Sequence, residues 1–219
     1  MPESLCARSE KEFMKVLLFA AGISTRWKGP RLGKHLSLVA GVPVLVRTLG
    51  QLSARDVEST VITYEPELAA LAPSWYSPPS SRWCNTFLHS REIWEGRVIA
   101  MHADVVWDDK ALDIVLDSAG LGFYGTRKGP WENFAAVFDP EHYERMKRAA
   151  RIAQKHKGDR SGTWEIYRAL VGIPLNNLYT FENVVWNEVK ESLKDDFTCD
   201  FDTVEKYENF LKANPWART

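Results

Sequence analysis

The stretch "VLLFAAGISTRWKGPRLGKHLSL" (residues 16–38) joins a short apolar segment to a loop of small and basic residues. Residues 15–20 are too few for a core helix and lead into Ala-Gly, so they predict a buried parallel strand. After the loop, residues 42–54 carry the apolar spacing of a helix with a proline in its first turn. Residues 57–64, "VESTVITY", alternate and are rich in β-branched side chains, which predicts a second strand. The chain therefore opens with a β-α-β unit whose first turn is basic.

Strand and helix patterns continue to alternate along the chain. Strands are predicted at residues 97–104, 122–126, 133–138 and 197–201, and helices at residues 85–94, 108–119, 140–156, 163–172 and 203–213. This alternation predicts one three-layer α/β domain with a mostly parallel central sheet over residues 14–219, preceded by a disordered leader at residues 1–13. Active sites of such sheets lie beyond the carboxyl ends of the strands, which places residues 21–34 and Asp104 on the functional edge.

Composition limits the classes of partner. The 28 Lys and Arg residues nearly balance 29 Asp and Glu residues, and the net charge of −1 gives no reason to expect binding to nucleic acid or to a membrane surface. The three cysteines are far apart and lack metal-ligand spacing, so a reducing, cytoplasmic setting is expected. The five histidines form no ligand or triad spacing and are interpreted as structural or surface residues. Any anion site must therefore be local.

The loop after the first strand lacks two familiar phosphate motifs. A Walker loop needs Gly-Lys followed by Ser or Thr, whereas here His35 follows Gly-Lys, and a dinucleotide fingerprint needs three glycines where only Gly22 is in place. What remains is a turn of small residues whose backbone N–H groups can approach an anion, with basic side chains to neutralise it. The candidate phosphate-binding residues are Ala20, Ala21, Gly22, Ile23, Ser24, Thr25, Arg26 and Lys34.

The spacing in this region resembles the signature of a family of nucleotidyltransferases with a GT-A-like, Rossmann-like fold. The residues that carry the resemblance are "LFAAGISTR" (18–26), then Lys34-His-Leu and Gly41-Val-Pro43. The family pattern is Leu-Ala-Ala-Gly-x-Gly-Thr-Arg, a variable loop, Pro-Lys-x-Leu, and Gly-x-Pro ahead of a helix. Its members include sugar-1-phosphate nucleotidyltransferases, MobA-like guanylyltransferases and phosphocholine cytidylyltransferases. Ser24 and Gly33 depart from the pattern, standing where the family has its second glycine and the proline before the lysine.

The resemblance implies transfer of a nucleoside monophosphate from an NTP to a phosphorylated small molecule, with release of pyrophosphate. Lys34, Arg26 and Asp104 are the expected catalytic residues. Such a transfer needs Mg²⁺, which prefers hard oxygen ligands. Asp104 resembles the family's strand-ending metal ligand, and Asp202 and Asp200 in "TCDFDT" could share one face of a strand and supply a second ligand. Two alternatives stay open: Asp108 is expected to cap the next helix, and Asp202 with Glu205 also fits a capping box.

Base and acceptor are less constrained by the sequence. Asn85 and Thr86 could hydrogen-bond a base edge, or Asn85 could be a helix N-cap; CTP is the preferred donor. A small acceptor-binding lobe is expected at residues 121–180. The candidate acceptor-binding residues there are Arg127, Lys128, Trp131, Glu132, Trp164, Glu165 and Tyr167. Aromatic side chains beside an acid would suit a quaternary ammonium, so choline phosphate is preferred over a sugar 1-phosphate, although aromatic residues at helical spacing are also typical of a core.

Two other classes are kept. One is a GT-A glycosyltransferase, which holds a nucleotide sugar through Asp-x-Asp and a metal; its members lack a basic triphosphate loop like that of residues 22–34. The other is a non-catalytic, nucleotide-binding regulatory protein, for which the departures at Ser24 and Gly33 are the supporting features.

Overall fold

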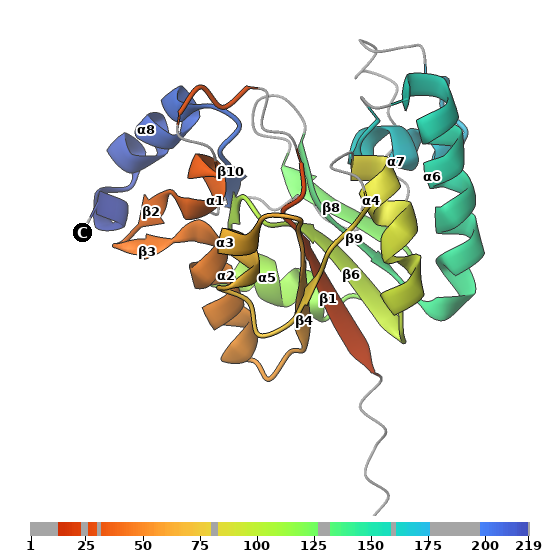
Figure 1. The fold of residues 1–219 in the computed structure, drawn as a ribbon, viewed down its shortest axis with the longest axis horizontal. Helices are drawn as coiled ribbons and strands as arrows, with labels where there is room; N and C mark the ends of the chain where they lie inside the picture. The colour runs from red at the N-terminus through yellow and green to blue at the C-terminus, as the bar shows by residue number, and fades with distance from the viewer. Residues whose placement is uncertain are drawn as a thin grey trace, which may run out of the picture.

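A computed structural model describes residues 13–22, 26–29, 32–79, 83–126, 132–158, 161–175 and 198–218. A central sheet in the order β5-β4-β1-β6-β9-β8 crosses the molecule (Figure 1). Its strands are β1 (Met14–Phe19), β4 (Ser59–Ile62), β5 (Trp75–Tyr76), β6 (Arg97–His102), β8 (Gly122–Thr126) and β9 (Glu132–Phe138). Strand β9 pairs antiparallel with both of its neighbours, and the other five strands share one direction. The predicted, mostly parallel α/β sheet is confirmed.

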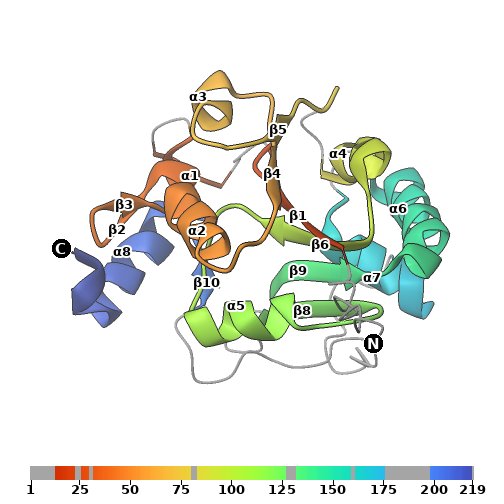
Figure 2. The same ribbon diagram turned by 90° about the horizontal axis from the view of Figure 1, so that it is seen from below.

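Helices cover both faces of the sheet because β1 is apolar on both sides. Val16 and Leu18 pack in one cluster with α2 (Val44–Ser53) and α5 (Asp109–Leu116). Leu17 and Phe19 point to the other face and pack in a second cluster. That cluster includes residues of α4 (Trp83–His89), α6 (Tyr143–Lys157) and α7 (Thr163–Val171). The two groups of helices lie on opposite sides of the sheet in Figure 2, which gives the three layers.

A third cluster attaches the C-terminal segment to the functional edge. Short strand β7 (Val105–Val106) pairs antiparallel with β10 (Cys199–Asp200), so Asp200 lies opposite Val105. Phe201 is fully buried in this cluster with residues of helix α8 (Val204–Ala213), against the hairpin of β2 (Leu38–Val39) and β3 (Val42–Pro43). The pairing brings Asp200, and with it Asp202, to the end of β6.

Several short elements were not predicted from the sequence. They are α1 (Gly33–Leu36), α3 (Pro66–Ala69), the strands β2, β3, β5 and β7, and the 3-10 segment Pro215–Arg218. Two parts of the expected helices, Ser90–Ile93 and Pro140–His142, are 3-10 rather than α-helical. Elements of two to four residues carry no measurable periodicity. Most of the expected leader lies outside the described residues. Among the helices that the structure describes, none has both the length and the apolar character needed to cross a membrane.

Candidate active site

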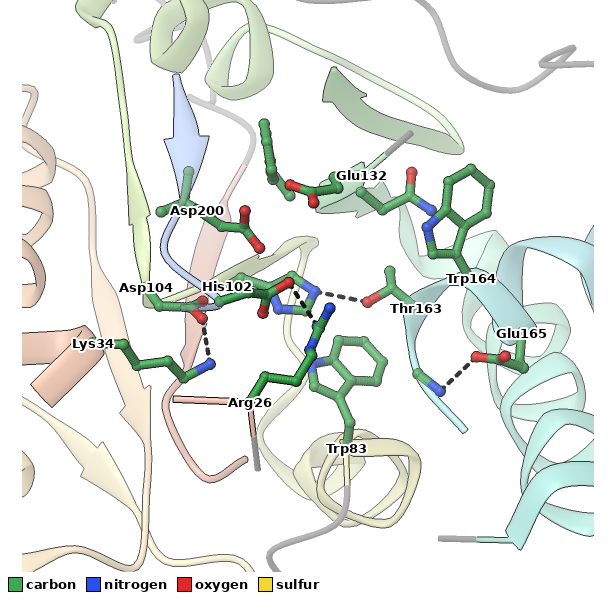
Figure 3. A pocket seen from close by; sticks show the side chains of 15 residues that line it. Arg26, Lys34, Trp83, His102, Asp104, Glu132, Thr163, Trp164, Glu165 and Asp200 are labelled. Carbon is green, nitrogen blue, oxygen red and sulfur yellow. Dashed lines mark hydrogen bonds and ion pairs between the residues drawn. The ribbon is translucent and has the colours of Figure 1, made fainter. Parts of the chain in front are cut away.

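A cavity of about 400 Å³ opens at the carboxyl edge of the sheet (Figure 3). It is bounded by the segment after β1, helix α1, the end of β6, the start of β9, the first turn of α7 and the segment around β10. The lining residues are Arg26, Lys34, Trp83, His102, Asp104, Val105, Glu132, Asn133, Phe134, Gly162, Thr163, Trp164, Glu165, Asp200 and Asp202. Because β9 runs opposite to β6, its first residues meet the last residues of β6 at this edge. Residues from both halves of the chain therefore face one cavity.

Lys34 and Asp104 form an ion pair at the base of this cavity. Lys34 lies in α1, Asp104 follows β6, and their side chains are only 16% and 6% exposed. Burial alone would raise the pKa of the Asp104 carboxyl, but Lys34, with nearby histidines, holds that pKa well below its usual range. Burial opposes the charge of Lys34 as well, yet the pair with Asp104 raises the pKa of the ammonium. Both groups are therefore charged at neutral pH.

A second ion pair closes one side of the cavity. Arg26 donates from Nη2 to Asp202 Oδ2 over 2.6 Å, and its side chain is 71% exposed while that of Asp202 is 14% exposed. Both basic side chains expected to bind phosphate are thus paired with carboxylates expected to bind metal. Arg26 is free to turn into solvent, whereas Lys34 is enclosed.

Three carboxylates, those of Glu132, Asp200 and Asp202, gather around the ammonium of Lys206. Lys206 Nζ lies 2.6 Å from Glu132 Oε1, 3.1 Å from Asp200 Oδ1 and 3.7 Å from Asp202 Oδ2. The three acids each offer an oxygen within 4.8 Å of the others. Burial and the neighbouring Glu132 raise the pKa of Asp200 to about 7. Excess negative charge is therefore concentrated at this point of the cavity.

The opposite wall comes from α4 and α7. His102 Nε2 lies 2.7 Å from Thr163 Oγ1, and its ring stacks on Trp83 with centroids 5.5 Å apart. Burial, more than the opposing attraction of Asp104, lowers the pKa of His102. Glu165 accepts from the backbone N–H of Gly162 at 2.8 Å, which satisfies one free donor of the α7 N-terminus. This wall is largely neutral and aromatic.

The structure brings together most, but not all, of the predicted site residues that it describes. Arg26, Lys34, Asp104, Asp200, Asp202, Glu132, Trp164 and Glu165 line the cavity. Ala20, Ala21 and Gly22 follow β1 at the same edge, with the two alanines buried and Gly22 exposed. The predictions for Ile23, Ser24, Thr25, Arg127, Lys128 and Trp131 lie outside the described residues.

Besides Ala20, Ala21 and Gly22, which lie at this edge but outside the lining, three predicted residues do not line the cavity. Tyr167 is fully buried against Phe123, one turn beyond the part of α7 that reaches the cavity. Asn85 lies inside α4 rather than at its N-cap, and its Oδ1 accepts from Gln154 of α6; Thr86 is buried beside it. The N-cap interpretation of Asn85 is therefore wrong, and the base-reading role of this pair stays a prediction.

The two capping alternatives for the acids have different outcomes. Asp108 is the N-cap of α5, with Oδ1 accepting from the Lys110 N–H at 3.0 Å, as predicted. Asp202 does not cap α8, because Thr203 is the N-cap and accepts from the Lys206 N–H at 3.1 Å. Asp202 is thus left to face the cavity.

The departure at Gly33 has a steric reason. A Cβ built on Gly33 would overlap the indole of Trp27, which lies against the backbone at this point. A proline there would meet the same ring. Trp27 and Gly33 therefore form one local arrangement at the start of α1, where Leu32 adopts a left-handed backbone with φ 66°.

Several residues at the site were not singled out from the sequence, among them Trp83, His102, Asn133 and Lys206. His102 ends a buried strand at the functional edge, two residues before Asp104, so its position was a usable signal. Lys206 follows Asp202 by four residues in the helix start, a spacing at which opposite charges meet. Trp83 and Asn133 carry no comparable signal in the sequence.

Comparison with known proteins identifies the fold. No protein-family model matches the sequence, and neither does any curated protein sequence. Among solved structures, a CTP:phosphocholine cytidylyltransferase from Streptococcus pneumoniae (LicC) matches with a TM-score of 0.58 and 13% identity, over 91% of this chain and 98% of that chain. A putative glucose-1-phosphate thymidylyltransferase from Bacillus anthracis matches with a TM-score of 0.63 and 12% identity, over 91% and 94%.

An inositol-1-phosphate CTP transferase from T. maritima matches with a TM-score of 0.51 and 11% identity, over 74% of this chain and 82% of that chain. At these identities the similarity establishes a shared fold. The chain therefore has the Rossmann-like fold of nucleotidyltransferases, as the sequence motif predicted.

Proposed function

We propose that this chain is a Mg²⁺-dependent nucleotidyltransferase, which transfers a nucleoside monophosphate from an NTP to a phosphorylated small molecule and releases pyrophosphate. The observation that carries this proposal is the cavity that holds Lys34 paired with Asp104 beside Arg26 paired with Asp202. A site with cations alone would suit any polyanion. Cations matched to carboxylates suit a ligand that brings its own cation, such as a magnesium-bound triphosphate.

The carboxylates of the cavity fit a magnesium ion by their chemistry. Glu132, Asp200 and Asp202 offer hard oxygen donors that lie close together. The ammonium of Lys206 lies among these carboxylates and pairs with them, so the cluster already binds a cationic group. We propose Asp104, Asp202 and Asp200 as the metal-binding residues, with Glu132 available beside them. When bound, Mg²⁺ supplies neutralisation of the charge on the α-phosphate and the pyrophosphate.

The residues of this chain then act mainly by positioning and charge neutralisation. Lys34 and Arg26 exchange their carboxylate partners for oxygens of the triphosphate. The backbone N–H groups at the turn after β1 donate to the same oxygens. An oxygen of the acceptor phosphate attacks the α-phosphorus in line, and the bond from that phosphorus to the bridging oxygen breaks as pyrophosphate leaves. A phosphate acceptor is already anionic near neutral pH, so no side chain is needed to remove a proton.

The structural neighbours are consistent with this proposal and with either acceptor considered from the sequence, choline phosphate or a sugar 1-phosphate. These neighbours are a phosphocholine cytidylyltransferase, a putative glucose-1-phosphate thymidylyltransferase and an inositol-1-phosphate CTP transferase. CTP stays the preferred donor by resemblance. The glycosyltransferase alternative is less favoured because the cavity contains a basic segment, with Arg26 and Lys34, in addition to acids.

The decisive experiment measures pyrophosphate release with each of four NTPs and a panel of phosphorylated acceptors in Mg²⁺. Lys34→Ala and Asp104→Asn should each lower kcat by at least about 100-fold, because they remove charge stabilisation in the cavity. Matched exposed controls, Lys212→Ala and Asp117→Asn, should keep wild-type turnover. Wild-type-like kcat in Asp104→Asn would sink the role of that carboxylate, and NTP binding without release for any acceptor would favour the regulatory alternative.

A further inference from the structure

Asn133 is a polar residue of the cavity with no assigned role. It is 8% exposed and lines the cavity beside residues of α7. Among the described residues, neither its Oδ1 nor its Nδ2 has a hydrogen-bond partner, and both atoms are buried. Buried amides are almost always hydrogen-bonded, so an unpartnered one that lines a cavity indicates a ligand group.

A β-bulge places Asn133 on this side of the sheet. The pairing of β8 with β9 shifts register between Tyr124 and Gly125, so that Ala135 pairs with Tyr124 but Asn133 pairs with Gly125. The consecutive residues Phe134 and Ala135 both pack in the cluster with α2 and α5, which breaks the alternation. Asn133 is thereby returned to the face where α7 lies. A Cβ built on Gly125 would overlap the Glu132 carbonyl, so this bulge requires glycine at that position.

The aromatic residues of this wall that the structure describes, Trp83, Trp164 and Tyr167, do not form a cage for a quaternary ammonium. Tyr167 is fully buried, and Trp164 meets it edge-on with centroids 6.0 Å apart. The ring of Trp83 is already stacked against Phe87 and His102. Its buried Nε1, however, has no partner among the described residues. The unsatisfied groups on this wall are therefore a carbonyl oxygen and N–H donors.

From this geometry we propose that the acceptor is a phosphomonoester whose organic part carries hydroxyl groups, a sugar or polyol phosphate, and that Asn133 is its specificity-determining residue. The inference rests on the proposed function and selects between its two acceptor classes. A hydroxyl group both donates and accepts, so it satisfies Oδ1 and Nδ2 of Asn133 together. The trimethylammonium of choline can do neither, and its binding would leave a buried amide unsatisfied.

The test compares glucose 1-phosphate with choline phosphate as acceptors. With the NTP that supports release, kcat/KM should be at least about tenfold higher for glucose 1-phosphate. Asn133→Leu keeps the branched outline of the side chain, at a larger volume, and removes its hydrogen bonds; it should reduce that ratio to near one, mainly by raising KM for the sugar phosphate. Asn133→Ala serves if the leucine variant does not fold. Asn214→Leu, a matched substitution in the last turn at the end of α8, should leave the ratio unchanged.

Two results would overturn the inference. One is equal or better turnover of choline phosphate by the wild type; the other is an unchanged acceptor ratio in folded Asn133→Leu and Asn133→Ala. If no acceptor releases pyrophosphate, the proposed function fails, and calorimetric titration of each acceptor into the NTP-bound protein still decides the role of Asn133. Binding of glucose 1-phosphate that weakens at least about tenfold in Asn133→Leu supports it, and equal binding of both acceptors contradicts it.

Discussion

The buried ion pair of Lys34 with Asp104 leads to a quantitative prediction for the free protein. Replacing Lys34 by Met removes the cation and leaves the Asp104 carboxylate, 6% exposed, without its principal partner. Breaking one side of a buried pair costs about 3–5 kcal/mol of unfolding free energy. For a chain of 219 residues, that loss corresponds to a fall in Tm of about 10 °C.

The reverse change, Asp104→Asn, should cost less. Lys34 is 16% exposed, and Asp200 and Asp202 also attract its charge. We expect a loss of about 1–2 kcal/mol, with partial reorientation of the ammonium toward those acids. The double variant should then be more stable than additivity predicts by about 2 kcal/mol, because it leaves no unpaired charge.

The assay is equilibrium unfolding in urea with a chelator present, so that no divalent cation replaces the lost charge. The exposed Lys212→Met variant serves as the control. All variants must keep the wild-type m-value for the comparison to hold. A loss below about 1 kcal/mol in Lys34→Met, or additivity within about 0.5 kcal/mol in the double variant, would refute the argument.

Three further predictions concern the surroundings of the site. Burial lowers the pKa of His35 from 6.5 to about 4, so the unfolded chain binds this proton at a higher pH than the folded chain does. The free energy of unfolding, measured in urea, should therefore fall by about 2 kcal/mol between pH 7 and pH 5. In His35→Asn this fall should be smaller. Gly125→Ala should cost at least about 2 kcal/mol and raise KM for the acceptor more than for the NTP, because its Cβ overlaps the Glu132 carbonyl; wild-type stability would argue against the bulge. Thr203→Ala should lower Tm by about 3 °C through loss of the α8 cap to Lys206, which calorimetry checks against Thr203→Ser as the conservative variant.

The sequence predicted the fold where the segments were long. The apolar run of β1 and the amphipathic α2, α5 and α6 have enough residues to show their period, and the motif around Lys34 added the family of folds. Edge strand β5 and helix α1 are too short for this. Their existence depends on neighbours supplied by the tertiary structure.

Site residues could be predicted from the sequence where their place in the cavity depends only on their position along a strand. Asp104 follows the last residue of β6 by two positions, and Asp200 and Asp202 alternate around buried Phe201, so their placement follows from topology and a period of two. Trp164 and Tyr167 show the limit. Three apart on α7, they were expected together, but only the first turn of this helix reaches the cavity, and Tyr167 packs against the sheet instead.

The single reversed strand of the sheet affects how such a protein can diverge. Strand β8 ends at Thr126 and β9 begins at Glu132, both at the edge that holds the cavity. Their register is set by the pairing of residues 122–124 with residues 135–137. Doubling the length of a flexible connection costs only about 0.6 kcal/mol of closure entropy. Insertions or deletions between these two strands can therefore be accommodated while the segment with Lys34 is left untouched. Under the proposed function, acceptor choice can evolve independently of nucleotide binding, which is one physical route to proteins that share this fold at 11–13% identity.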